Sequence, residues 1–71
     1  MKEFILEDRE FIELYKILKI AGWASSGGEA KAVIAEGQVL VNGVTETQKR
    51  KKIIAGDSVA FKNEIISVHA K

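Results

Sequence analysis

Residues 22–43 read GWASSGGEAKAVIAEGQVLVNG and decide the fold, because the spacing of apolar residues changes within this stretch. Its first half is helical in pattern. Ser26-Gly27-Gly28-Glu29 predicts a capping box, in which Ser26 and Glu29 satisfy each other's free backbone amides at the start of a helix. We expect this helix to run to about Glu36, to stop at Gly37, and to bury Ala30, Val33 and Ile34.

The second half of the stretch has the two-residue period of a strand. Val39 and Val41 alternate around Leu40, and Asn42-Gly43 follows, a pair typical of tight hairpin turns because both residues tolerate positive φ. A partner strand is expected from about Val44. Further along the chain, alternating apolar residues predict strands around Val59 and Phe61 and over residues 65–68, with turns at Ala55-Gly56-Asp57 and Lys62-Asn63-Glu64.

Before residue 22, the pattern predicts a first helix from Phe11 to Ala21. Phe11, Leu14, Tyr15 and Leu18 share one face of it, and Gly22 is a natural C-terminal stop. Asp8 is the expected helix cap, and residues 4–6 form a short strand. We therefore expect Phe11, Tyr15 and Phe61 in the core of an α+β domain, with a two-helix hairpin packed on a small, mostly antiparallel sheet.

The composition limits what such a domain can do. Its 71 residues make one domain, with 46% hydrophobic and 30% charged residues, no cysteine and one histidine, His69. Disulfides, thiolate zinc sites and cysteine nucleophiles are therefore excluded, and we expect no metal, cofactor or small-molecule substrate. No apolar run is as long as a membrane span, so a cytoplasmic location without membrane contact is expected.

Charge is concentrated in one place. The net charge is only +1, yet residues 45–71 hold six basic and three acidic groups, and Lys49-Arg50-Lys51-Lys52 are consecutive. Such a run is often only a solvated stretch, but four adjacent cations repel one another unless an anion neutralises them. In an extended segment alternate side chains point to opposite faces, so two or three of them can meet one anionic backbone. Arg50 is the favoured member because its planar fork can hold a phosphate through two hydrogen bonds.

An ordered set of residues resembles a known family pattern. The resemblance is to the RNA-binding domain named after small-subunit ribosomal protein S4, also called the αL motif, and in particular to its small stand-alone bacterial YbcJ-like branch. It covers roughly residues 11–61. It rests on Gly22-Trp23-Ala24-Ser25-Ser26, Glu29-Ala30-Lys31, Ile34, Gly37, Val39, Val41-Asn42-Gly43 and Gly56-Asp57.

The resemblance implies two helices on a small curved sheet and a cytoplasmic, bacterial protein that binds structured RNA, often ribosomal or transfer RNA. It also implies RNA contacts from Lys31 and from Lys49, Arg50, Lys51 and Lys52. Gln38 and Asn42 can donate to phosphate or 2′-hydroxyl oxygens, and Ser26 lies where bare helix amides favour anions. In one respect the chain departs from the family: many members carry arginine just after the turn serine, where this chain has Gly27.

Several polar and aromatic residues also have a purely structural interpretation. Asn42 can serve the turn alone, and Ser26 can be a plain cap whose partner Glu29 occupies the same amides. Trp23 can stack on a base or, more commonly at such a turn, fill the core. His69 has no carboxylate or serine partner that suggests catalysis.

For the whole chain we expect a monomeric, non-catalytic module that recognises RNA by phosphate and shape contacts. The alternative is a protein–protein adaptor that uses its apolar surface.

Overall fold

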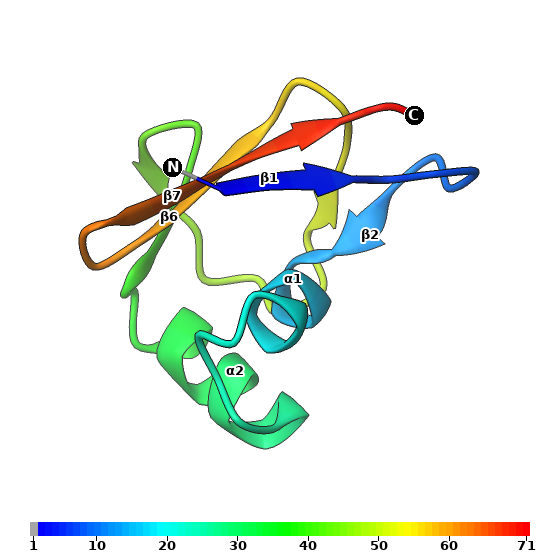
Figure 1. The fold of residues 1–71 in the computed structure, drawn as a ribbon. Helices are drawn as coiled ribbons and strands as arrows, with labels where there is room; N and C mark the ends of the chain where they lie inside the picture. The colour runs from blue at the N-terminus through cyan, green and yellow to red at the C-terminus, as the bar shows by residue number, and fades with distance from the viewer. Residues whose placement is uncertain (1) are drawn as a thin grey trace.

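The computed structural model describes residues 2–71. Within them the chain forms two helices and seven strands, and Figure 1 shows their arrangement. In chain order these are β1 (Lys2–Ile5), β2 (Ile12–Glu13), α1 (Leu14–Ile20), α2 (Gly27–Ala35), β3 (Val39–Val41), β4 (Val44–Thr45), β5 (Lys52–Ile53), β6 (Ser58–Phe61) and β7 (Glu64–His69).

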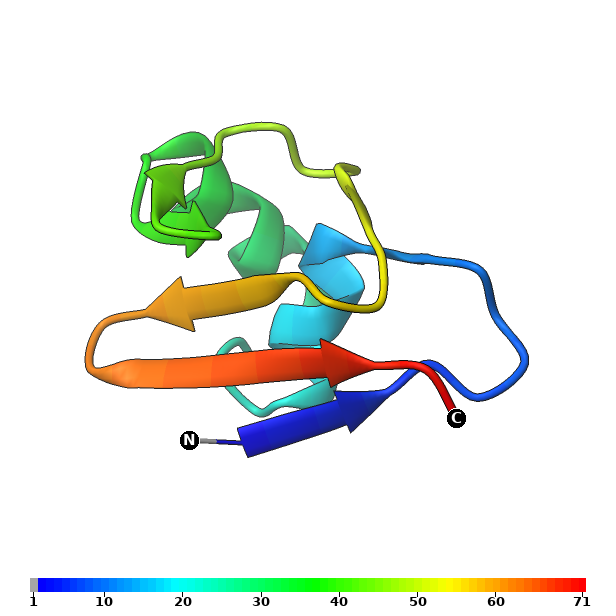
Figure 2. The same ribbon diagram turned by 90° about the horizontal axis from the view of Figure 1, so that it is seen from above.

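Five strands form the main sheet in the order β1-β7-β6-β3-β4. The pairs β3–β4, β3–β6 and β6–β7 are antiparallel, and the N-terminal strand β1 adds to the edge parallel to β7. Both helices lie on the same face of this sheet (Figures 1 and 2). The expected α+β class, with a helix pair on a mostly antiparallel sheet, is confirmed.

A single apolar core fills the space between the helices and the sheet. Alternate residues of the strands point into it, as the pleat requires, while the helices contribute their buried stripes. The core consists of Leu6, Ile12, Leu14, Ile17, Leu18, Ala24, Ala30, Ile34, Val39, Val41, Ile53, Val59, Phe61, Ile66 and Val68. Trp23 is half-buried and packs against this cluster, with its ring centroid 5.7 Å from that of Phe61, so it covers the edge of the core rather than lying within it.

The first helix starts later than the sequence pattern predicts. Residues 12 and 13 pair instead with β5, so α1 begins at Leu14, and the prediction that Phe11 lies in the core was wrong: its side chain is 38% exposed. Asp8 does not cap α1, because the N-cap residue of this helix is Glu13. The Glu13 side chain makes no capping hydrogen bond. Backbone carbonyls from residues 49 and 51 take this role, as described below. The predicted stop is right, since Gly22 has φ +79° just after the helix.

The second helix and the hairpin follow the local signals closely. Ser26 Oγ accepts a hydrogen bond from the Glu29 amide at 3.1 Å, as predicted, but the Glu29 carboxylate accepts from Ser25 rather than from Ser26. Val33 is only half-buried. Asn42 and Gly43, at φ +52° and +83°, form the turn between β3 and β4.

Candidate functional site

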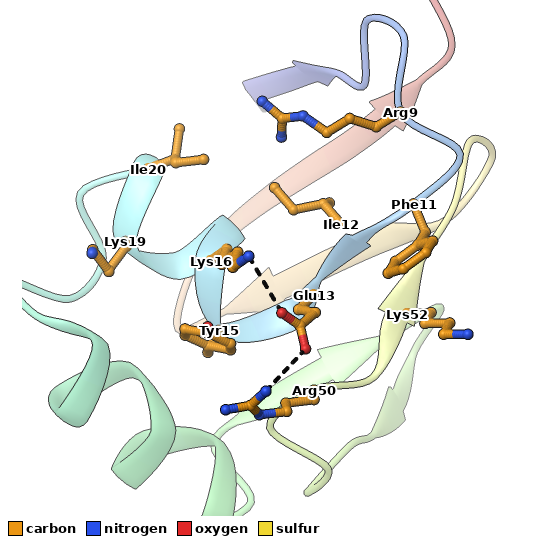
Figure 3. A pocket seen from close by; sticks show the side chains of 10 residues that line it. All are labelled: Arg9, Phe11, Ile12, Glu13, Tyr15, Lys16, Lys19, Ile20, Arg50 and Lys52. Carbon is orange, nitrogen blue, oxygen red and sulfur yellow. Dashed lines mark ion pairs between the residues drawn. The ribbon is translucent and has the colours of Figure 1, made fainter.

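An open groove of about 760 Å³ runs along the outward face of α1. One wall is the segment that leads into the helix, and the other is the basic segment, residues 49–52. Figure 3 shows the side chains that line it: Arg9, Phe11, Ile12, Glu13, Tyr15, Lys16, Lys19, Ile20, Arg50 and Lys52.

Helical spacing brings four of these side chains to one face of α1. Tyr15 and Lys19 are four residues apart, as are Lys16 and Ile20, so each pair lies one above the other on the helix surface. Leu14, Ile17 and Leu18 occupy the opposite, buried side. The same periodicity that fixes the helix to the core therefore turns two lysines toward the groove.

The basic segment is held beside α1 by its own backbone. The Leu14 amide donates to the carbonyl of Lys51 at 3.0 Å, and the Tyr15 amide donates to the carbonyl of Lys49 at 3.1 Å. These bonds satisfy two of the amides that a helix start leaves free, in place of a side-chain cap. Lys49 and Arg50 lie in a turn that the Lys51 amide closes by donating to the Gln48 carbonyl at 3.2 Å, so the segment is not extended throughout, and Lys52 begins β5. Of the four basic side chains, Arg50 and Lys52 line the groove.

The groove is strongly positive. Five cationic side chains line it against a single carboxylate, that of Glu13. Glu13 lies 3.4 Å from Lys16 Nζ and 3.7 Å from an Arg50 guanidinium nitrogen (Figure 3). Within residues 2–71 no ion pair involves the other three cations, Arg9, Lys19 and Lys52. Most of this charge is therefore left for an external anion.

Tyr15 joins the groove to the second helix. The Lys31 ammonium of α2 lies 4.7 Å from the centre of the Tyr15 ring, and the Arg50 guanidinium carbon lies 5.9 Å from it. Cations are attracted to the face of an aromatic ring. The ring thus gathers two predicted site residues that are nineteen positions apart in the sequence.

The remaining predicted residues do not line the groove. Lys49 and Lys51 are exposed beside it. Ser26 caps α2, and the Gln38 amide donates to the Glu36 carboxylate at 2.6 Å. Both ends of the Asn42 side chain are used within the protein, because its Nδ2 donates to Asp57 at 2.9 Å and its Oδ1 accepts from the Ser58 amide at 2.9 Å.

Sequence reasoning missed three of the cations, Arg9, Lys16 and Lys19. Lys16 and Lys19 could have been found, since they lie on the side of the predicted helix away from its apolar stripe and three residues apart. Nothing in the sequence places Arg9 with them, because Arg9 comes from the loop before β2.

Gly27 lies directly beside the groove. It is the position at which many members of the family that this sequence resembles carry arginine. A Cβ atom added there would lie 3.9 Å from both the Lys19 side chain and the Tyr15 ring, which is ordinary van der Waals contact. An arginine at this position would thus enlarge the same positive surface.

No group of three or more histidine, aspartate or glutamate side chains within residues 2–71 is placed to hold a metal ion. In the same part of the chain, neither helix has the length and apolar character needed to cross a membrane.

Comparison with known proteins gives one consistent result. The model of a family described as the S4 domain matches residues 4–69. "Putative RNA-binding protein YbcJ" of Escherichia coli (strain K12) is 47% identical over 70 residues, which cover 99% of this chain and all of the relative. "Probable ribosome maturation protein RlbA" of Bacillus subtilis (strain 168) is 40% identical over 52 residues, 73% of each chain.

A solved structure agrees with these relatives. The solution structure of YbcJ from E. coli, described as revealing an αL motif involved in RNA binding, superimposes with a TM-score of 0.76. The match covers 99% of this chain and 89% of the YbcJ chain, at 47% identity. Fold and sequence therefore point to the same family.

Proposed function

Because the chain belongs to the S4 domain family and is an RNA-binding module, we propose that it holds the backbone of structured RNA in the groove along α1. The observation that carries this proposal is the charge of the groove, where five cations face one carboxylate in a protein whose net charge is only +1. Phosphate contacts supply most of the affinity of such interfaces.

The geometry favours recognition of phosphate and shape rather than of sequence. Lysine and arginine side chains on three separate segments surround the groove, and Lys31 adds a cation through its contact with Tyr15. Contacts of this kind fix the position of a protein on RNA without reading base edges. Arg50 can hold one phosphate through two hydrogen bonds.

Ribosomal RNA is the class that we favour, with transfer RNA as the other candidate. The support is the similarity to a relative whose name places it in ribosome maturation. In this proposal the protein acts by binding alone, as a monomer in the cytoplasm. The alternative of a protein–protein adaptor predicts instead a partner that is retained at high salt without RNA.

The test is the salt dependence of RNA binding, measured by fluorescence anisotropy with a labelled hairpin from ribosomal RNA. Neutralising three to five phosphates predicts a slope of log affinity against log salt of roughly −2 to −4.5. A transfer RNA and a DNA duplex of the hairpin's sequence serve as competitors, and we expect the ribosomal hairpin to be preferred. Absence of binding at low salt would contradict the proposal and favour the adaptor.

A further inference from the structure

Phe11 is an aromatic ring exposed inside a phosphate-binding groove. It precedes β2 and α1, its side chain is 38% exposed, and it lines one end of the groove (Figure 3). A surface that met only phosphates would gain nothing from an apolar floor, and an exposed phenyl ring carries a cost in water. The position of Phe11 therefore calls for a ligand group with an apolar face.

The charge next to Phe11 identifies that group. The Lys52 ammonium lies over the Phe11 ring, 4.9 Å from its centre, so an apolar ring and a cation are held together at this end of the groove. A nucleotide presents the same two features together, a flat base and a phosphate. Base pairs within a helix are stacked on each other and cannot reach such a ring, whereas unpaired bases can stack on aromatic side chains.

We propose that Phe11 is a stacking platform for one unpaired base, with the Lys52 ammonium moving from the ring to the adjoining phosphate, so that the groove prefers RNA helices interrupted by a bulge or a loop. This inference rests on the proposed function and names the RNA feature that the same groove selects. Stacking on an aromatic ring tolerates any base, so the preference is for an unpaired nucleotide rather than for a sequence.

The experiment compares three labelled RNA hairpins that differ at one position. The first is fully paired, the second carries one bulged adenosine, and the third carries an abasic nucleotide at the bulge. The abasic hairpin keeps the extra phosphate and the distortion of the helix but lacks the base. We expect the wild-type protein to bind the adenosine bulge about 5-fold to 150-fold more tightly than the abasic one, the range for one stacked base.

Two variants assign this preference to the ring. Phe11→Ala should bind the adenosine and abasic bulges alike, with the salt slope unchanged, because stacking releases no counterions. Ile65→Ala is the matched control, since Ile65 is 45% exposed and alternates with buried Ile66, which places it on the sheet face away from the helices. It should keep the wild-type preference, and circular dichroism should show both variants folded.

The outcomes separate this inference from the proposed function. Equal binding of the adenosine and abasic bulges by the wild-type protein would overturn the stacking inference while leaving phosphate binding intact. Retention of the adenosine preference by Phe11→Ala would also overturn it. Failure of the wild-type protein to bind any of the hairpins at low salt would overturn the proposed function and the inference with it.

Discussion

Asn42 shows how one side chain can unite two parts of a sequence motif. Its amide group connects the turn between β3 and β4 with Asp57 and Ser58, and the second Asp57 oxygen accepts from the Ile54 amide at 2.9 Å. The Asn-Gly pair and the later Gly-Asp pair of the family pattern are therefore joined in the structure by the hydrogen bond between Asn42 and Asp57. These hydrogen bonds explain why asparagine occupies position 42 without any contact to RNA.

We predict that Asn42→Ala destabilises the domain without altering its electrostatic binding. Loss of two hydrogen bonds and of a residue that tolerates φ +52° should lower the free energy of unfolding by about 1–2 kcal/mol. Urea denaturation measures this effect. Asn63→Ala is the control, because the Asn63 side chain forms no hydrogen bond within residues 2–71, and it should unfold like the wild type. Weaker RNA binding by folded Asn42→Ala, at an unchanged salt slope, would show instead that Asn42 contacts the RNA, because its neutral amide releases no counterions.

At Gly27 the sequence departs from the family pattern, and the structure gives this departure a measurable consequence. We predict that Gly27→Arg strengthens RNA binding several-fold and steepens the salt slope by about 1, since it adds a cation beside Lys19 and Tyr15. Stability should change little, because the better helix propensity, about 1 kcal/mol, is offset by a cation at a helix N-terminus, about 0.3–1 kcal/mol.

The matched control for this change is Gly28→Arg. It adds the same charge one residue further along α2, where an added Cβ would lie 3.9 Å from Ser26 Oγ rather than beside Lys19 and Tyr15. Anisotropy titrations of both variants should show the larger gain for Gly27→Arg. Equal gains would mean that the charge acts through the general field of the protein and not through the groove.

At the scale of elements, the basic segment illustrates how backbone pairing selects among identical charges. Its carbonyls at Lys49 and Lys51 cap α1, so that Arg50 and Lys52 line the groove.

We predict that Arg50→Ala/Lys52→Ala weakens RNA binding roughly 10-fold to 100-fold at low salt and flattens the salt slope by about 2. Lys49→Ala/Lys51→Ala removes the same charge and should have a clearly smaller effect. Equal losses from the two double variants would contradict the assigned orientation of the segment.

The elements also show where sequence reasoning succeeds. The second helix and the hairpin were predictable because their signals are local: a cap, a glycine stop and an Asn-Gly turn. The start of α1 and the β2–β5 pair were not, since they depend on bonds between residues 12–15 and 49–53, far apart in the chain. The same long-range contact explains why Arg50 and Lys52 were found as candidates but their convergence with Arg9, Lys16 and Lys19 was not.

For the whole molecule, the decisive feature is that both ends of the chain complete the main sheet. Strand β1 lies parallel to β7, and the Leu6 amide donates to the His69 carbonyl at 2.9 Å. Leu6, Ile66 and Val68 belong to the core. The motif that can be recognised in the sequence covers roughly residues 11–61, but the apolar core that stabilises the groove extends beyond it on both sides.

We therefore predict that a fragment of residues 11–61 does not fold. It keeps every groove residue except Arg9, yet it loses β1, β7 and three core side chains, each of which is expected to contribute about 2–5 kcal/mol when truncated alone. That loss approaches or exceeds the whole stability of a domain this small. Circular dichroism should show no cooperative thermal transition and anisotropy no salt-dependent RNA binding.

A variant ending at His69, which loses only two exposed residues outside β7, is the control and should match the full chain. A folded, RNA-binding 11–61 fragment would show that the helix pair and hairpin suffice without the outer strands.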